Sequence, residues 1–594
     1  MTTHLLILTL GPVQDFIAQA RRTRDLWYGS HLLSELGRAA ARALAAGGAN
    51  LVFPALKKGD SELEPCIAPL RADGIMPMSI ANKLVAEVPS GVDAASLARK
   101  VRGAVMGYWR EALAAPVKSR CAGLLAQGID AIWDEQIDSF LEFSVSWAPL
   151  GDYAKTRRQL DSAIAARKLL RDFAPWKQVR GAVPKSSLNG ARETVLRPSR
   201  EREPDLARKY RIADGENLDA IDLVKRAGGE PEQFVPVVNV ALASWIALAS
   251  EEARSELQQV KNACREAGVA RVARKDLPCA APFPFDASVL LPSRWSSIFE
   301  EQGLEDDAER WGRKHIQPLL DKLCAPYPYV ACLVADGDHV GRTIDSLGSA
   351  ELHRGFSKAL SRFANEARKI VEQQHRGVLV YAGGDDVLAF VPIPEALSCA
   401  DNLRICFKTS IADATSSLPD DRRPTLSVGL GIGHVMESMG DLLALGREAE
   451  REAKCNRNAL AIVVDKRSGG KRLWRACWSE DPVRNLRDSE KLLAERLPSR
   501  KAYEIAALLA RLPQAAGGDD AGWSRVLSLE VRRCLSRVEG GSLKPEDAGL
   551  PIGTGNNFAE LRRAVESWVA RLLIARTLVQ AAPYVRDRRQ EVAA

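Results

Sequence analysis

Residues 377–392 of this chain, GVLVYAGGDDVLAFVP, most constrain what it can fold into. Two apolar runs rich in β-forming residues, 378–381 and 387–390, flank a turn of two glycines and two aspartates. Apolar runs of this length separated by a Gly-rich turn predict a β-hairpin. Its tip carries the adjacent carboxylates of Asp385 and Asp386. Like charges side by side repel, so a cation or hydrogen bonds must compensate them, although polar hairpin turns also occur for purely geometric reasons.

The segments around this hairpin follow the order of a ferredoxin-like α+β sheet. An apolar strand is predicted upstream and another downstream, with a helix between each strand and the hairpin. Strand, helix, hairpin, helix, strand is the order of that sheet, and a further helix and strand follow. The predicted strands are 329–335, 425–434 and 460–464, and the predicted helices are about 350–374, 395–415 and 440–455.

The N-terminal part of the chain predicts the same order of elements. A helix follows Gly11-Pro12, and its apolar stripe is interrupted near Tyr28-Gly29. Two copies of one α+β fold are therefore expected, without a repeat at the level of residues. The predicted strands are 4–10, 50–53, 83–88 and 140–147, and the later helices are about 94–125 and 152–172.

Gly429, Gly431 and Gly433 alternate with apolar residues along one predicted strand. All three glycines therefore lie on one face of the sheet, where they leave room for a closely packed helix. A dinucleotide-binding loop needs glycines at a strand-to-helix turn with different spacing, so that type of site is excluded here.

Composition limits the class of protein. No apolar run reaches 18 residues, so no transmembrane helix and no membrane partner is expected. The apolar start of the chain lacks a basic leader, which favours a strand over a signal peptide. None of the 11 cysteines forms a C-x-x-C pair, so neither a zinc module nor a disulfide scaffold is expected, and a cytoplasmic location is the simplest interpretation.

The net charge of +7, from 83 basic and 76 acidic residues, permits contact with nucleic acid but does not require it. Arg21, Arg22 and Arg24 form the one candidate basic patch that the sequence offers. A solvated helix face is the simpler interpretation of these arginines. Contact with phosphate or with a partner subunit is the alternative.

Asp336 follows the strand at 329–335, which lies beside the hairpin in a ferredoxin-like sheet. Asp336 is therefore expected next to Asp385 and Asp386, although a strand-end turn would also explain it. Carboxylates are the ligands that Mg²⁺ takes together with substrate phosphates. Lys454 either reaches a triphosphate at this site or pairs with Glu450 one helical turn away.

These motifs resemble a known family. The Asp336-Gly337-Asp338 turn, the hairpin, SVGLGIG and the run from Ala453 to Asn458 resemble the palm domain of GGDEF-type nucleotide cyclases. They resemble more closely the second palm of the large subunit of type III CRISPR effector complexes. Three further segments look like the Cmr branch of that family: GPVQDFIAQARRTRDLWYGSHLLSEL (11–36), GENLDAIDLVKRAG (215–228) and RSGG (467–470).

The resemblance implies an enzyme that makes cyclic oligoadenylates from ATP once its complex has bound target RNA. Asp336, Asp385 and Asp386 would be the catalytic residues and would bind Mg²⁺ or Mn²⁺. The other nucleotide- or metal-binding residues that it implies are Gly337, Gly383, Gly384, Lys454 and, in the first palm, Ser30. Asp338 would shape the turn rather than bind metal.

The implied architecture is an α+β multidomain protein with two ferredoxin-like palm domains. The expected domains are an N-terminal palm without an acidic site (1–175), a helical linker (176–320), a catalytic palm (321–480) and a C-terminal helical bundle (481–594). The implied partners are the subunit that binds the 5′ end of the guide RNA, the small subunits, CRISPR RNA and target RNA.

Two departures from the family pattern modify these expectations. Many relatives begin with an HD-type nuclease domain, but none of the seven histidines here precedes an aspartate, so no such nuclease is expected. Many relatives also carry a zinc site of cysteines between the palms. The corresponding segment, 184–190, has no cysteine, so no zinc is expected.

Two other functions stay open on the sequence. The chain could be a catalytically silent scaffold for guide RNA and neighbouring subunits. It could also be a diguanylate cyclase of the GGDEF type, although the two-palm architecture and the helical tail argue against this.

Overall fold

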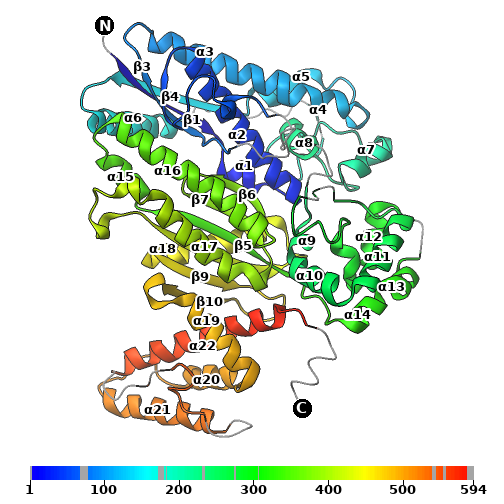
Figure 1. The fold of residues 1–594 in the computed structure, drawn as a ribbon. Coiled ribbons are helices and arrows are strands. Elements are labelled where there is room, and N and C mark those ends of the chain that lie inside the picture. The colour runs from blue at the N-terminus through cyan, green and yellow to red at the C-terminus, as the bar shows by residue number, and fades with distance from the viewer. Residues whose placement is uncertain are drawn as a thin grey trace.

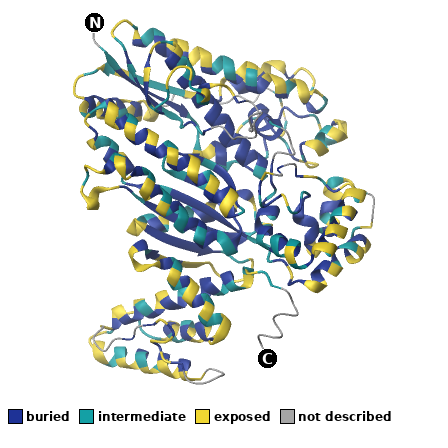
Figure 2. Ribbon diagram, in the orientation of Figure 1, coloured by how far each residue is buried: buried dark blue, intermediate teal, exposed yellow. Residues whose placement is uncertain are grey.

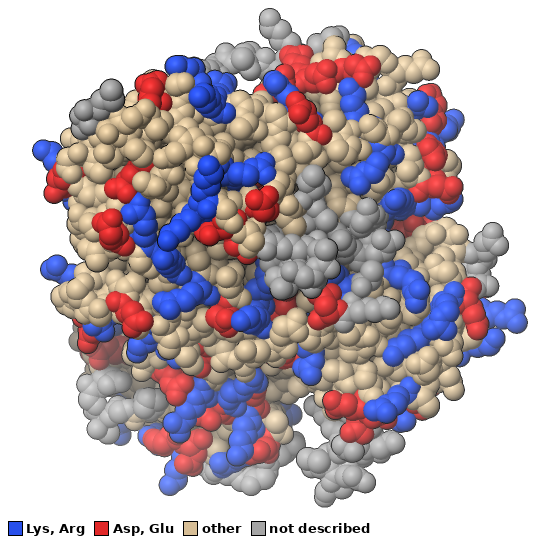
Figure 3. Space-filling view, turned by 45° about the horizontal axis from the view of Figure 1, so that its top comes forward, with Lys and Arg blue, Asp and Glu red and all other residues tan. Residues whose placement is uncertain are grey.

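The computed structural model describes residues 3–66, 78–170, 180–181, 183–229, 234–272, 274, 276–304, 307–537, 543–550, 552 and 557–584. Two helix-covered sheets lie above a C-terminal helical bundle, and the helices that connect the sheets form a lobe at one side (Figure 1). Buried residues gather in the sheets and on the inner sides of the helices (Figure 2). Lys and Arg are interspersed with Asp and Glu over the face in Figure 3.

The first sheet has four antiparallel strands in the order β2-β3-β1-β4, as a ferredoxin-like fold requires. Leu5 and Ile7 of the central strand pack on one side of the sheet, and Leu6 and Leu8 pack on the other. The strands predicted at 50–53 and 83–88 are confirmed. The strands are β1 (His4–Gly11), β2 (Asn50–Phe53), β3 (Lys83–Val88) and β4 (Glu142–Pro149).

The helix after Pro12 is interrupted earlier than predicted. It ends at Ala18, and a second helix begins at Thr23 and runs without a break past Tyr28 and Gly29. Gly29 serves close packing instead, since a Cβ there would lie 2.6 Å from Cε of Lys225. The helices of this unit are α1 (Gln14–Ala18), α2 (Thr23–Ala46), α3 (Ala94–Gly107), α4 (Ala115–Arg120), α5 (Asp130–Asp138) and α6 (Tyr153–Leu169).

The connecting region consists largely of short helices. A buried ion-pair network fastens it to the first unit: Arg226 donates to Asp25 of α2 at 2.5 and 2.8 Å and to Glu216 at 2.9 and 3.1 Å. The helices are α7 (Pro204–Lys209), α8 (Ala220–Ala227), α9 (Val237–Ala241), α10 (Ala243–Glu252), α11 (Arg254–Ala267), α12 (Trp295–Gln302), α13 (Ala308–His315) and α14 (Gln317–Lys322).

The second sheet has six strands in the order β10-β9-β8-β5-β7-β6. Its four strands β8-β5-β7-β6 repeat the ferredoxin order of the first sheet, which confirms the predicted pair of α+β units. Strand β10 was not predicted, because it lies at the sheet edge and buries only Trp474 and Ala476. The strands are β5 (Tyr329–Asp338), β6 (Val378–Gly383), β7 (Asp386–Val391), β8 (Thr425–His434), β9 (Ala459–Val464) and β10 (Arg472–Cys477).

Helices cover both faces of this sheet. Helices α16 and α17 pack on the face that carries Leu333 and Leu430, and α18 packs on the opposite face. The glycine prediction is confirmed, since a Cβ on Gly431 would lie 2.3 Å from the amide nitrogen of Gly446 in α18. The helices are α15 (Val340–Ser346), α16 (Ala350–Lys369), α17 (Ile393–Ile411) and α18 (Met439–Asn456).

The C-terminal part is helical, as predicted, and lies at the bottom of Figure 1. Leu561, Val565, Trp568 and Leu572 form the predicted apolar face of the last helix and are buried. No helix among the described residues is long and apolar enough to cross a membrane. The helices are α19 (Pro482–Glu495), α20 (Arg500–Arg511), α21 (Asp520–Ser536) and α22 (Phe558–Ala581).

Candidate active site

The end of β5 lies beside the tip of the β6–β7 hairpin. Strands β5 and β7 are antiparallel with Ala335 opposite Val387, so the next position places Asp336 opposite Asp386. A Cβ on Gly337 would lie only 2.8 Å from Oδ2 of Asp385. The structure therefore brings the three predicted carboxylates together, and it leaves no room for a side chain at Gly337.

The hairpin tip depends on its two glycines. Gly384 has a φ of +74°, which glycine adopts without steric cost. A Cβ on Gly383 would overlap the phenol of Tyr381, at 1.7 Å from the hydroxyl oxygen. The tip faces the first unit, since a Cβ on Gly384 would lie 4.0 Å from Cζ of Phe53 in β2.

The carboxylates of the tip repel one another. Burial and then the charge of Asp336 raise the pKa of Asp385 to about 7. The same two causes, together with the charges of Asp385 and Glu450, raise the pKa of Asp386 to about 7. Burial and the charge of Asp336 also raise the pKa of Glu450 in α18. A bound cation would relieve this repulsion.

Lys454, near the end of α18, contacts the end of β5. Its ammonium lies 2.6 Å from Oδ2 of Asp336 and 3.1 Å from Oδ1 of Asp338, and it donates to the carbonyls of Asp336 and Gly337 at 2.9 Å. Burial opposes its charge, but the hydrogen bond and charge of Asp336 outweigh burial, so the pKa of Lys454 is raised. Lys454 thus pairs with Asp336 and Asp338 rather than with Glu450, the alternative that its helical spacing allowed.

Asp338 is 1% exposed and is surrounded by donors. It accepts hydrogen bonds from the hydroxyls of Thr425 and Ser427 and from the backbone amide of Asn458 at 2.9 Å. Asn458 has a φ of +43°, so the carboxylate holds an unusual turn where α18 leads into β9. With its oxygens occupied in this way, Asp338 has a structural role at the end of β5.

The first unit contributes Phe53 to the surroundings of the tip. Ser30 lies within α2 and is 5% exposed, whereas Phe53 is the residue of the first unit that approaches Gly384. The sequence analysis missed Phe53, and it considered Glu450 only as a partner of Lys454 and not as a neighbour of the tip carboxylates. Glu450 could have been found, because it lies one helical turn before Lys454 on the same face of α18.

The carboxylate oxygens fit a hard divalent cation. Among the described residues, however, no group of three or more His, Cys, Asp or Glu side chains is arranged to hold a metal ion. At the hairpin tip, Oδ2 of Asp336 lies 2.6 Å from the ammonium of Lys454. A cation that takes this oxygen as a ligand would replace the ammonium.

Comparisons with known proteins agree with this geometry. Residues 329–461 match the family model described as Cas10/Cmr2, second palm domain, and residues 5–114 match that of CRISPR-associated protein Cmr2, N-terminal. The CRISPR system Cmr subunit Cmr2 of Pyrococcus furiosus is 26% identical over 556 residues, which cover 78% of this chain. The chain spans 62% of the length of that relative.

Solved structures show the same fold. The chain superimposes on a subunit of the type III-B Cmr-beta complex in its apo state with a TM-score of 0.63 at 14% identity, covering 97% of this chain and 82% of that one. For the Cmr-beta complex bound to cognate target RNA, the TM-score is 0.64 at 14% identity, with coverages of 97% and 83%. Two separate parts of the chain, 5–114 and 329–461, are thus similar to Cmr2 and Cas10/Cmr2 domains, and the fold agrees with that of the Cmr-beta chains.

Proposed function

We propose that this chain is the large subunit of a Cmr-type CRISPR effector complex and joins ATP molecules into cyclic oligoadenylates when target RNA is bound. The observation that carries this proposal is the juxtaposition of Asp336, Asp385 and Asp386 where β5 meets the β6–β7 hairpin. Three carboxylates that repel one another are costly to fold, which favours a role in holding divalent cations.

Asp336, Asp385 and Asp386 would hold Mg²⁺ or Mn²⁺, and the bound ions would supply positive charge for the triphosphate and for the attacking ribose hydroxyl. The glycine backbone at Gly383 and Gly384 lets a nucleotide approach the tip closely. Lys454, released from Asp336, would bind a phosphate of the substrate. The first palm, with Phe53 facing the tip, would form one wall for the second ATP.

The proposed partners follow from the relatives. The Pyrococcus furiosus relative is a Cmr subunit, and the similar solved chains belong to complexes, one of them bound to target RNA. We therefore propose that this chain assembles with the subunit that holds the 5′ end of the guide RNA and with small subunits. CRISPR RNA and target RNA would lie within the same complex.

The test is mass spectrometry of the products that the assembled complex makes from ATP, Mg²⁺ and target RNA. Cyclic oligoadenylates that form only with target RNA are the expected result. A complex that binds target RNA and makes no product overturns the enzyme and leaves a scaffold. A parallel reaction with GTP tests the diguanylate cyclase, which would yield a cyclic guanine dinucleotide instead.

Mg²⁺ should stabilise the protein more strongly at about pH 8 than at about pH 6. The pKa values of Asp385 and Asp386 are raised to about 7, above the ordinary value near 3.8. Their protonated forms stabilise the metal-free protein below pH ~4, and this stability is lost as the pH rises through about 7. Above that pH the two carboxyls are ionised, and bound Mg²⁺ would supply the positive charge that compensates them.

Thermal unfolding with and without Mg²⁺ at the two pH values measures this effect through the shift in Tm. The variant Asp385→Asn/Asp386→Asn should lose the Mg²⁺-dependent shift at both pH values. An equal shift in this variant would place the stabilising ion elsewhere.

A further inference from the structure

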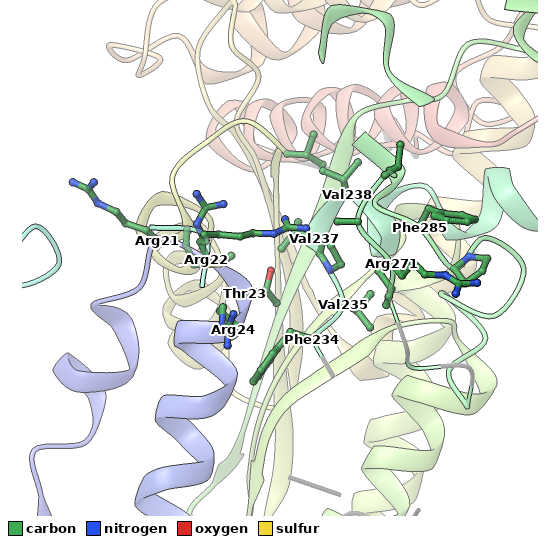
Figure 4. Close-up of a pocket in the computed structure, with 18 of the residues that line it drawn as sticks. Arg21, Arg22, Thr23, Arg24, Phe234, Val235, Val237, Val238, Arg271 and Phe285 are labelled. Atoms are coloured by element: carbon green, nitrogen blue, oxygen red, sulfur yellow. The ribbon is translucent and has the colours of Figure 1, made fainter. Parts of the chain in front are cut away.

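A cavity of about 1050 Å³ lies away from the hairpin tip. The start of α2 forms one wall, the segment 234–238 runs along the middle, and residues around Arg271 and Phe285 form the other side (Figure 4). Met439 and Leu442, at the start of α18, also line it. Lys454 lies near the other end of this 18-residue helix, ~22 Å along its axis from Met439.

The cavity is strongly basic. Eight of the 24 described residues that line it are Lys or Arg, and Glu437 is the one acidic residue among them. This local excess contrasts with the nearly balanced 83 basic and 76 acidic residues of the whole chain. The positive charges of these side chains repel one another within the cavity, and an anionic ligand would reduce this repulsion.

Arg24 is the lining residue whose environment most clearly favours a bound anion. It is 5% exposed, yet its Nε and Nη2 atoms have no hydrogen-bond partner among the described residues. Its guanidinium packs over the rings of Tyr210 and Phe234, at 5.6 and 5.0 Å from their centroids. Burial and then the charge of Arg226 lower the pKa of Arg24 to about 10. A buried, unsatisfied guanidinium is costly, so the expected solvated helix face is wrong for this residue.

Asp25, the acidic residue next to Arg24, does not neutralise the arginines at the start of α2. Asp25 is already engaged by Arg226, and it caps α2 by accepting from the backbone amides of Arg21 and Arg22 at 3.1 Å. Within the described part of the chain, the structure shows no ion pair for the guanidinium of Arg21, Arg22 or Arg271. Arg21 and Arg22 immediately precede the 24-residue helix α2, whose N-terminal dipole also favours an anion.

We propose that this cavity binds the phosphates of a short single-stranded RNA segment. A phosphodiester chain places several negative charges along an extended path, which matches cations that come from α2, α7, α11 and the loop at Arg271. Between these cations, the partly exposed Pro236 and Val238 offer apolar surface to the bases. A single phosphate would satisfy only a few of the cations.

The test measures binding of a fluorescent single-stranded oligouridylate to the full chain, without ATP or Mg²⁺, so that it is independent of the proposed catalysis. The variant Arg21→Glu/Arg22→Glu/Arg271→Glu should bind at least about tenfold more weakly. Its slope of log affinity against log salt should be shallower by about 0.7 for each phosphate that the variant no longer neutralises. Arg21 and Arg271 are exposed and Arg22 is partly exposed, so replacing them leaves the buried Arg24 and the core intact.

The control is Arg310→Glu/Arg484→Glu/Arg525→Glu, which changes the net charge equally at exposed sites outside the cavity. Unchanged binding by the control supports the cavity, whereas equal weakening by both variants overturns it. ATP and inorganic phosphate serve as competitors. Displacement of the RNA by ATP at matched phosphate concentration would assign the cavity to a nucleotide and overturn the RNA site.

Discussion

Replacing Asp385 and Asp386 together by alanine should reduce cyclic oligoadenylate formation by a factor of about a thousand or more. Groups that neutralise charge in phosphoryl transfer supply rate factors of roughly this size. The variant removes two of the three carboxylates that would hold the divalent cations, and it leaves Asp336 paired with Lys454. The measurement is product formation by the assembled complex, followed by mass spectrometry.

The fold should survive this change. Burial and the charge of Asp336 raise the pKa values of both carboxyls to about 7, so the ionised pair destabilises the metal-free protein at neutral pH. The alanine variant should therefore unfold at the same temperature as the unmodified protein without Mg²⁺, or at a higher one. Assembly with the other subunits and binding of target RNA should also persist.

A matched control exists in the same unit. Asp420 and Asp421 are also adjacent, but they lie in an exposed turn before β8. The variant Asp420→Ala/Asp421→Ala should keep full activity. If the hairpin variant retained activity as well, the metals would not be held at the tip, and the proposed mechanism would be wrong.

The arrangement of the backbone could be predicted because it follows from hydrophobic periodicity and turn residues. The ferredoxin order places Asp336 beside the hairpin once β5 and β7 are assigned, and the register confirms this neighbourhood. The alternation of Gly429, Gly431 and Gly433 likewise predicted a closely packed helix. The glycine inference rests on the period of two residues along a strand, and the Asp336 inference rests on the order of the elements, and both can be read from the sequence.

The pairing of charged side chains could not be predicted in this way. Lys454 has Glu450 at a favourable helical spacing, but the tertiary fold brings Asp336 and Asp338 closer. The sequence places Arg24 in an Arg-rich run that is typical of a solvated helix face. In the structure it packs against Tyr210 and Phe234 and is buried. In both cases the deciding partner comes from a distant segment, which local patterns do not reveal.

The close contact between α18 and β8 leads to the second large effect. A Cβ on Gly431 would lie 2.3 Å from the amide nitrogen of Gly446 and 2.4 Å from the carbonyl carbon of Leu445. These are backbone atoms of a helix, so they cannot move aside as a flexible side chain could. Gly431→Ala should therefore displace α18 and lower the free energy of unfolding by about 3 kcal/mol.

Gly355→Ala is the opposing control. Gly355 lies inside α16, and a Cβ there would meet no atom within 4 Å. Alanine at this position should stabilise the helix by about 0.5–1 kcal/mol, because glycine is the poorer helix former. Thermal unfolding of the two variants should thus shift in opposite directions.

Displacement of α18 also has a functional consequence. The helix carries Glu450 and Lys454 to the end of β5 and begins at the basic cavity with Met439 and Leu442. Gly431→Ala should therefore impair product formation even below its unfolding temperature, whereas Gly355→Ala should not. Full activity of folded Gly431→Ala would show that the position of α18 tolerates displacement and that Lys454 is not needed where this structure places it.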